Sequence, residues 1–377
     1  MESEIQNKSQ EKLKLSEYLQ TFSPEVQKQY DELPRGLKDD GLLILAEGKI
    51  HQGDLHIAEN IIGIIEDTDY IQKKGLISLS LAEYKQGNKE KADERVANIL
   101  EQVKKDDHDY LYPNISQYYF QTDRVEKVLE IIDDIKVEND PNLAWSIIEP
   151  LASYELNDGR YQEAIALEKY LSIEYYSTEL LVMVARKIGH QFPEEAVKIL
   201  QRASESATNE KNGTSSHKVD NAWAFIGQPE NIKHGKLPSQ TLELAKHNFI
   251  TGNISTGKDL IEKAIVETIK SHTNDSTDLA SLYCECGRAY LLLSDPEHKK
   301  TKEYLYKAIQ TISGIKYEGL YQEEMAYEKD GLLQKIEQTL MEIGDLDGIK
   351  KAHSVAISSG KYRAQLEILA LQVKSET

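Results

Sequence analysis

The side chains that could bind metals or act as nucleophiles are scattered in this sequence. His51 and His56 lie five residues apart, with no cysteine or second histidine pair at ligand spacing. Because a zinc site needs about four ligands, we expect no metal site. Cys284 and Cys286 are too close in sequence for an ordinary disulfide or a CxxC redox pair. On a helix their side chains would point about 200° apart, so we expect both thiols to be reduced.

No sequence motif of a known catalytic site is present. Adjacent carboxylates such as Asp133 and Asp134 could act as acid and base, but a chain with 64 acidic residues has many such pairs on solvated helix faces. The phosphate-binding loop, GxGxxG, GxSxG and HExxH patterns do not occur. We therefore expect no catalytic residues, no cofactor and no enzymatic activity. An α/α enzyme whose site forms from scattered residues remains an alternative.

The composition favours helices and argues against nucleic acid as a partner. The 377 residues include only 21 Gly and 9 Pro, and long stretches consist of good helix formers. The net charge is -19 and Lys and Arg are not clustered, whereas nucleic-acid binding needs clustered basic residues. From Glu101 to Asp140 there are 11 acidic and 5 basic residues. This stretch is either a solvated face or a surface for a basic partner.

The chain shows no segment that would direct it to a membrane. The first residues, Met1 to Leu15, are polar and contain no apolar core of a secretory signal. No apolar run approaches the roughly 20 residues of a membrane span. We expect a cytoplasmic protein without membrane insertion.

A repeat is visible in the spacing of turn residues. Gly53, Gly87, Asp123, Gly159 and Gly252 each follow a stretch with helical apolar period, and Ser294 is a sixth candidate. A small residue stands seven positions before each turn, and a small or apolar residue stands five positions after the first five turns: Ala46, Ser80, Ser116, Ala152, Ala245 and Gly287 before, and Ala58, Ala92, Val128, Ala164 and Gly257 after. Small residues let two helices cross closely, and Gly or Asp ends the first helix in a left-handed cap. The pattern predicts stacked antiparallel helix pairs.

This pattern resembles the tetratricopeptide repeat, since the first four turns lie 34, 36 and 36 residues apart. The resemblance implies an all-α fold, an αα-hairpin superhelix. The family's first-helix Trp and closing Pro are absent. Its Tyr four residues before the turn is matched only by Tyr119 and Tyr290, and the equivalent positions hold Lys49, Glu83, Glu155 and Asn248. An αα-solenoid of another family is the alternative.

The regularity of the repeat divides the chain into four expected segments. Residues 1–36 form a helical lead-in, 37–205 the repeat array, 206–237 a linker or insertion, and 238–377 a less regular helical lobe. A fifth helix pair is expected from Ser172 to Ala203, with Pro193 opening its second helix. Within the polar segment, the apolar run that begins at Trp223 is expected to pack back onto the body, and a docking motif is the alternative.

The resemblance also suggests where a partner would bind, because the first helix of each pair lines the concave groove of tetratricopeptide arrays. Counting back from the turns gives the candidate partner-binding residues Lys74, Ile77, Tyr84, Tyr110, Gln117, Phe120, Gln121, Ser146, Glu149, Ser153 and Asn157. The set is mixed and not strongly basic, so a carboxylate-clamp groove, which needs several Lys, Arg and Asn, is not recognisable. The chain also has 21 Tyr against 5 Phe, and tyrosines suit protein interfaces as well as contacts between repeats.

These observations predict a non-enzymatic scaffold or adaptor that binds a protein or peptide. A regulator whose helical array responds to a peptide or small molecule is the alternative. The sequence indicates neither the partner nor the oligomeric state.

Overall fold

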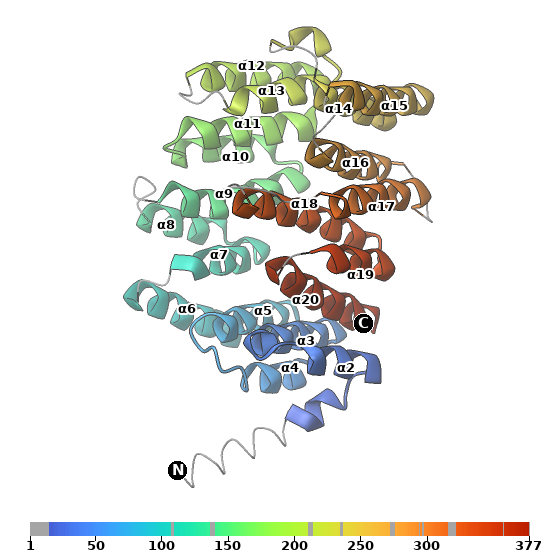
Figure 1. Cartoon of the computed structure of the whole chain (residues 1–377). Coiled ribbons are helices and arrows are strands. Elements are labelled where there is room, and N and C mark those ends of the chain that lie inside the picture. The colour runs from blue at the N-terminus through green and yellow to red at the C-terminus, as the bar shows by residue number, and fades with distance from the viewer. Residues whose placement is uncertain are drawn as a thin grey trace. The chain divides into compact units, whose positions relative to one another are not determined.

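The structure, a computed structural model, consists of helices. It describes residues 15–106, 109–135, 140–209, 214–233, 237–271, 276–293, 295, 298–315, 322–356 and 358–376. Within these ranges the chain forms α-helices and short 3-10 helices and no strands (Figure 1). The predicted all-α class is confirmed.

The helices group into two compact units. Unit 1 comprises Met1–Ile131 and Gly344–Thr377, and unit 2 comprises Ile132–Ile343. The helices of unit 1 are α2 (Pro24–Glu32), α3 (Lys38–Gln52), α4 (Leu55–Ile62), α5 (Ile71–Lys85), α6 (Lys89–Asp106), α7 (Tyr112–Gln121), α19 (Leu346–Val355) and α20 (Ser358–Ser375), with α8 (Val125–Asp134) beginning in this unit. Those of unit 2 are α9 (Pro141–Asn157), α10 (Tyr161–Ala166), α11 (Glu174–Ile188), α12 (Pro193–Asn209), α13 (Thr214–Phe225), α14 (Pro238–Ile250), α15 (Ile254–Ser271), α16 (Ser276–Tyr290), α17 (Lys299–Ser313) and α18 (Gln322–Glu342). Short 3-10 helices lie at Arg35–Leu37, Asp109–Leu111, Leu167–Tyr170 and Pro229–Asn231.

The predicted turns separate consecutive antiparallel helices. Gly53, Gly87, Gly159 and Gly252 have φ values of 83°, 97°, 77° and 83°, and Asp123 has φ 62°. Gly adopts this left-handed conformation without strain, and Asp tolerates it because its short side chain bonds locally. The turn prediction is confirmed at these five positions, whereas Ser294 lies outside the described residues.

The small residues around each turn are buried where paired helices cross. Ala46, Ser80, Ser116, Ala152 and Ala245 are 0 % exposed, as are Ala58, Ala92, Val128 and Ala164 after the turns. The fifth predicted pair also forms: α11 packs along α12, which begins at Pro193. The repeat pattern therefore describes close helix crossings, as the spacing predicted.

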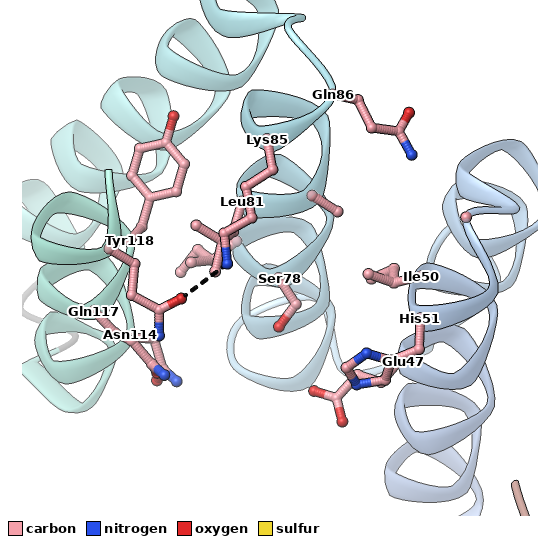
Figure 2. A pocket seen from close by; sticks show the side chains of 14 residues that line it. Glu47, Ile50, His51, Ser78, Leu81, Lys85, Gln86, Asn114, Gln117 and Tyr118 are labelled. Atoms are coloured by element: carbon pink, nitrogen blue, oxygen red, sulfur yellow. Dashed lines mark hydrogen bonds between the residues drawn. The ribbon is translucent and has the colours of Figure 1, made fainter. Parts of the chain in front are cut away.

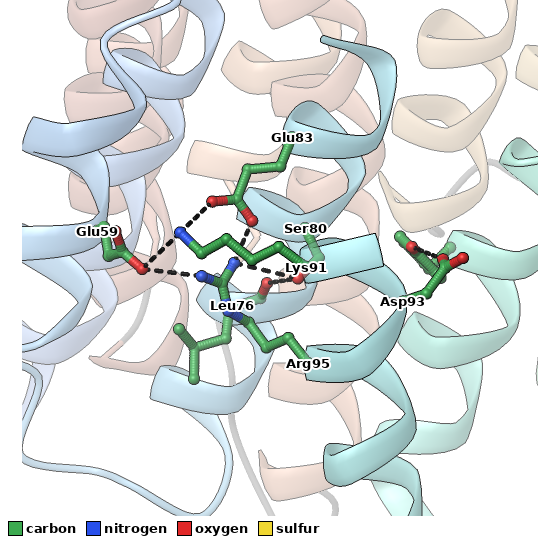
Figure 3. Close-up of polar contacts among 8 residues, drawn as sticks. Glu59, Leu76, Ser80, Glu83, Lys91, Asp93 and Arg95 are labelled. Carbon is green, nitrogen blue, oxygen red and sulfur yellow. Dashed lines mark hydrogen bonds and ion pairs between the residues drawn. The ribbon is translucent and has the colours of Figure 1, made fainter. Parts of the chain in front are cut away.

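Charged residues occupy several positions at which tetratricopeptide repeats carry Tyr. Glu83 is 4 % exposed and lies between cations from the next helix (Figure 3). Arg95 donates to Glu83 at 2.5 Å and to Glu59 at 2.8 Å, and Lys91 donates to Glu83 at 2.7 Å. These ion pairs join α4, α5 and α6 and compensate the buried carboxylate.

The C-terminal helix α20 belongs to unit 1 although more than 300 residues separate it from α3. It packs against α2 and α3, and Leu369 and Val373 share a buried cluster with Leu45 and Leu79. The Glu376 side chain accepts a hydrogen bond from the backbone N–H of Ser23 at 3.1 Å, which ties the end of α20 to the start of α2. Unit 1 is thus built from both ends of the described chain.

The segment expected as a linker or insertion, 206–237, contains helix α13 in its described part. Val219, Trp223 and Ile226 are buried, and α13 packs on α11, α12 and α14. Trp223 thus packs onto the body as expected. Gly227, with φ 79°, forms one more left-handed turn before α14.

The division into compact units falls at 131/132 and 343/344. It groups residues by spatial contact, whereas the boundaries expected at 36/37, 205/206 and 237/238 follow the regularity of the repeat and stay a prediction. Two features of the structure are not visible in that regularity. The polar composition of α13 conceals an apolar stripe, and the docking of α20 on α3 is a contact between residues far apart in sequence.

Candidate functional site

A cavity in unit 1 lies between the first helices of three successive helix pairs, α3, α5 and α7 (Figure 2). Its volume is about 590 Å³, within the range of pockets that bind small ligands. It is lined by Glu47, Ile50, His51, Gly53, Ile77, Ser78, Leu81, Ala82, Lys85, Gln86, Asn114, Gln117, Tyr118 and Gln121.

The lining repeats at the same positions on each helix. Counted back from the turn, positions two, six and nine are Gln121, Gln117 and Asn114 on α7 and Lys85, Leu81 and Ser78 on α5. On α3, positions two and six are His51 and Glu47. These positions share one face because they follow the helical period. The array therefore presents one comparable row of side chains per helix pair.

The lining combines apolar groups with amides. Ile50, Ile77 and Leu81 supply the apolar surface, and the α7 row supplies three side-chain amides. An amide side chain carries both donor and acceptor groups, as does a peptide backbone. The cavity thus offers hydrogen bonds that do not depend on the side chains of a bound peptide.

Glu47 is the half-buried carboxylate of this cavity. Burial raises the pKa of Glu47 above its usual range, and Lys74, His51 and a hydrogen bond from Ser78 offset this only in part. Burial also raises the pKa of nearby Asp40, again against the charge of Lys74. Lys74 therefore lies within electrostatic reach of two carboxylates.

Lys85 places a cation at the opposite end of the α5 row. Its side chain is exposed, and its Nζ donates to Oε1 of Gln121 at 3.4 Å (Figure 2). This length is beyond the usual range of an N–H···O bond, so the contact is weak. The cavity therefore has the carboxylate of Glu47 near Ser78 and the ammonium of Lys85 about two helical turns further along α5.

The structure brings together some of the predicted unit 1 residues and not others. Ile77, Gln117 and Gln121 line the cavity. Lys74 lies near Glu47, and its positive charge lowers the pKa of the Glu47 carboxyl. Tyr84 is outside the lining and contacts the Tyr118 ring edge-on at 6.1 Å between centroids.

Two predicted aromatic residues lie elsewhere. Tyr110 is 45 % exposed and pairs edge-on with Tyr70 at 5.2 Å. Phe120 is 5 % exposed, so its side chain belongs to the core and presents almost no surface to a partner. Neither ring lines the cavity.

A second cavity, of about 840 Å³, lies within unit 2 between α9, α11, α13 and α16. Three predicted residues, Glu149, Ser153 and Asn157, line it. Ser146 does not, and its hydroxyl donates to the Leu143 carbonyl of its own helix at 2.6 Å. The other lining residues are Trp145, Leu156, Glu179, Val182, Met183, Arg186, Lys187, Phe225 and Arg288.

The cations of the unit 2 cavity are already paired. Arg186 donates to Glu243 at 2.6 Å, and its guanidinium lies over the Phe225 ring. Arg288 pairs with Glu285 at 2.8 Å. Lys187 donates a hydrogen bond to Asn157 at 2.8 Å. Asn157, a predicted partner-binding residue, is thus already engaged. A ligand here would have to displace these ion pairs, whereas Lys85 in the unit 1 cavity makes only a long contact with the neutral amide of Gln121.

Sequence reasoning missed most of the lining, including Glu47, His51, Ser78, Leu81, Lys85 and Asn114. The signal that could have found them is the shared register. Once Gln117 and Gln121 are placed six and two positions before their turn, the same count on the two preceding helices gives Glu47 with His51 and Leu81 with Lys85. Counting each helix separately concealed the common row.

The side chains considered for redox or metal chemistry have ordinary structural roles. Cys284 and Cys286 are buried and free. Burial raises the pKa of each thiol to about 12, so both are protonated and poor nucleophiles at neutral pH. Among the described residues no group of three or more His, Cys, Asp or Glu side chains could hold a metal ion. None of the described helices combines the length and apolarity needed to cross a membrane.

Comparisons with known proteins give little further information. No family model matches the chain, and no curated protein matches it. One similar solved structure is a "circular tandem repeat protein with novel repeat topology and enhanced subunit contact surfaces", with 14 % identity over 90 % of this chain and 85 % of that chain and a TM-score of 0.24. At this identity and TM-score, the alignment carries no inference about function. The helical repeat is therefore described from the chain's own turns and crossings, without assignment to the tetratricopeptide family.

Proposed function

We propose that this chain is a non-enzymatic scaffold or adaptor that binds an extended segment of another protein in the unit 1 cavity. The observation that carries the proposal is the common row of lining side chains on α3, α5 and α7. A surface that repeats from one helix pair to the next suits a ligand that is itself a repeating polymer, such as a polypeptide.

The chemistry of the row supports a peptide over a small polar metabolite. Asn114, Gln117 and Gln121 can each donate to a carbonyl and accept from an N–H. An extended peptide exposes such groups on both edges, and leaving them unpaired on binding costs free energy. Ile50 and Leu81 offer apolar surface for alternate side chains.

The side chains that line the cavity support a binding function without catalysis. Catalysis by general acid and base needs titratable groups within hydrogen-bond reach of one another and of a bound substrate. The titratable groups of the lining are Glu47, His51, Lys85 and Tyr118, whereas the row on α7 is uncharged. Apolar side chains and amides make up most of the lining, which favours recognition over chemistry.

Selection of peptides on the whole chain tests this proposal. Peptides from a random displayed library are selected on the wild-type protein, and their dissociation constants are measured by fluorescence anisotropy. The double variant Asn114→Ala/Gln117→Ala removes two amides from the cavity. A matched double variant, Asn98→Ala/Gln102→Ala, removes the same groups from exposed positions on α6.

We expect the cavity variant to weaken binding about tenfold or more, since each lost hydrogen bond is worth about 1 kcal/mol. The α6 variant should leave affinity within about twofold. Equal affinities for the two variants, with both proteins folded by circular dichroism, would place the binding site elsewhere.

A further inference from the structure

The two charged groups of the unit 1 cavity lie at different levels along α5. Glu47 lies beside Ser78, which hydrogen-bonds to it, and Lys85 follows Ser78 by seven residues on the same face. Seven helical residues rise about 10 Å. An extended peptide covers this distance in about three residues. The cavity thus has the spacing to distinguish two positions of one peptide.

Glu47 has room for a cationic ligand group. Among the described residues, the cations that lower the pKa of its carboxyl are Lys74 and His51. Lys74 also acts on Asp40, and the His51 side chain is exposed to solvent, which screens its charge. Their combined charge does not compensate for the burial of the carboxylate. An ammonium or guanidinium group from a ligand would supply the missing compensation.

Lys85 offers the complementary interaction at its own level. Its Nζ has a long contact with the neutral amide oxygen of Gln121. A carboxylate would form a shorter, charge-assisted hydrogen bond with the same ammonium. The side chain is exposed and can move to meet such a group.

We infer that the unit 1 cavity selects extended peptides that carry a basic side chain at Glu47 and a carboxylate about three residues away at Lys85. This inference rests on the proposed function and adds the class of peptide. The carboxylate can belong to an acidic side chain or to the peptide's C-terminus.

The charge of the whole chain supports the basic part of this specificity. With a net charge of -19, the protein attracts cationic segments over long range and accelerates their association. Long-range attraction by itself does not select a spacing. The positions of Glu47 and Lys85 within one cavity supply that selection.

The test compares the peptides selected by the wild type and by three variants. Glu47→Gln and Lys85→Gln each remove one charge with little change in shape, and Glu47→Asp keeps the negative charge as a control. Two displayed random libraries are used, one with free peptide carboxyl termini and one with termini fused to the display protein. Selected peptides are counted only if Asn114→Ala/Gln117→Ala weakens their binding.

The expected result is enrichment, on the wild type, of Lys or Arg about three positions from a carboxylate. On Glu47→Gln the basic residue should fall to its library frequency, and a wild-type-selected peptide should bind about tenfold more weakly. Lys85→Gln should remove the preference for the carboxylate and keep the preference for the basic residue. Glu47→Asp should retain the basic preference. Enrichment in only the free-terminus library identifies the C-terminus as the carboxylate, whereas enrichment in both identifies a side chain.

Two results would contradict the inference, and they differ from each other. If cavity-dependent peptides show no basic residue, or bind Glu47→Gln as tightly as the wild type, the specificity is wrong and the proposed binding site stands. If no selected peptide depends on Asn114 and Gln117, the proposed function fails together with the inference. Thermal unfolding of each variant establishes that a loss of binding is not a loss of fold.

Discussion

Val373 on α20 touches α3 at Gly48, with no room for a side chain between the two helices. A β-carbon at Gly48 would lie 2.1 Å from Cγ1 of Val373. The C-terminal helix is therefore in close contact with the first helix pair. Because α3 also supplies Glu47 and His51 to the cavity, the packing of α20 helps to position one wall of the candidate site.

Substitution of Gly48 should reveal this contact. Gly48→Ala forces an overlap with Val373, which we expect to cost about 1–3 kcal/mol of unfolding free energy. Gly331→Ala is the matched control, because it also lies within a helix and has nothing within 4 Å of the added carbon. The control should be neutral or stabilising by up to about 1 kcal/mol. Chemical denaturation followed by circular dichroism measures both, and equal effects would show that α20 does not pack on Gly48.

The buried face of α20 should contribute to the stability of unit 1. Leu369 is 0 % exposed and packs in the cluster that contains Leu45. Leu369→Ala should destabilise by about 2–5 kcal/mol through lost burial and the cavity it leaves. Leu292→Ala, at a side chain that is 44 % exposed, should change stability by less than about 1 kcal/mol. A small effect of Leu369→Ala would indicate that the C-terminal helix is dispensable.

The ion pairs of Figure 3 should differ in their importance according to burial. The Glu83 and Arg95 side chains are 6 % and 15 % exposed, so Arg95→Ala leaves a buried carboxylate with less compensation. We expect a loss of about 3 kcal/mol. Lys91 is 56 % exposed, and Lys91→Ala should cost about 1 kcal/mol or less. If the two variants unfold at the same denaturant concentration, the network does not hold the three helices together.

The ionised Glu47 carboxylate should lower the unfolding free energy of the chain at neutral pH. Since burial raises its pKa in the folded chain, the folded state binds the proton more tightly than the unfolded state. Stability from this group is therefore greatest below the ordinary carboxyl pKa and falls as the pH rises through the raised value. Glu47→Gln removes this dependence and should stabilise the chain at pH 7.

The measurement is the unfolding free energy of the wild type and Glu47→Gln at several pH values. The difference should be positive at pH 7 and should disappear near about pH 3, well below the ordinary carboxyl pKa, where the carboxyl is protonated in both states. A basic peptide selected by the wild type should stabilise the ionised carboxylate. In its presence the wild type should therefore have a larger unfolding free energy than Glu47→Gln at neutral pH. A Glu47→Gln variant that is less stable at pH 7 would show that the carboxylate is already compensated.

Much of the local architecture could be predicted from the sequence because it depends on short-range chemistry. Gly53, Gly87 and Asp123 adopt left-handed turns, and the small residues around them permit close helix crossings. The helix α13 was missed because its polar surface outweighs a narrow apolar stripe that includes Val219 and Trp223. A helix with such a composition is stabilised mainly by tertiary packing, which the sequence pattern does not show.

The candidate site could be predicted only in part. Gln117 and Gln121 were found by counting back from Asp123, because the helical period fixes which face they share. Phe120, one residue from this row, is buried, since a step of one residue turns the side chain by about 100°. Glu47 was missed because its importance depends on burial and on Lys74 from another helix, which sequence spacing does not report.

Photo-crosslinking tests most directly whether the unit 1 cavity is the binding site. A photoreactive phenylalanine analogue is placed at Gln86, which lines the cavity, and in a matched variant at Gln102, which is exposed on α6. A labelled peptide selected on the wild type is added, irradiated and analysed by mass spectrometry. Efficient crosslinking from position 86 with little from position 102 is the predicted result. Equal crosslinking at both positions, or crosslinking at position 102 alone, would contradict the assignment of the cavity as the binding site.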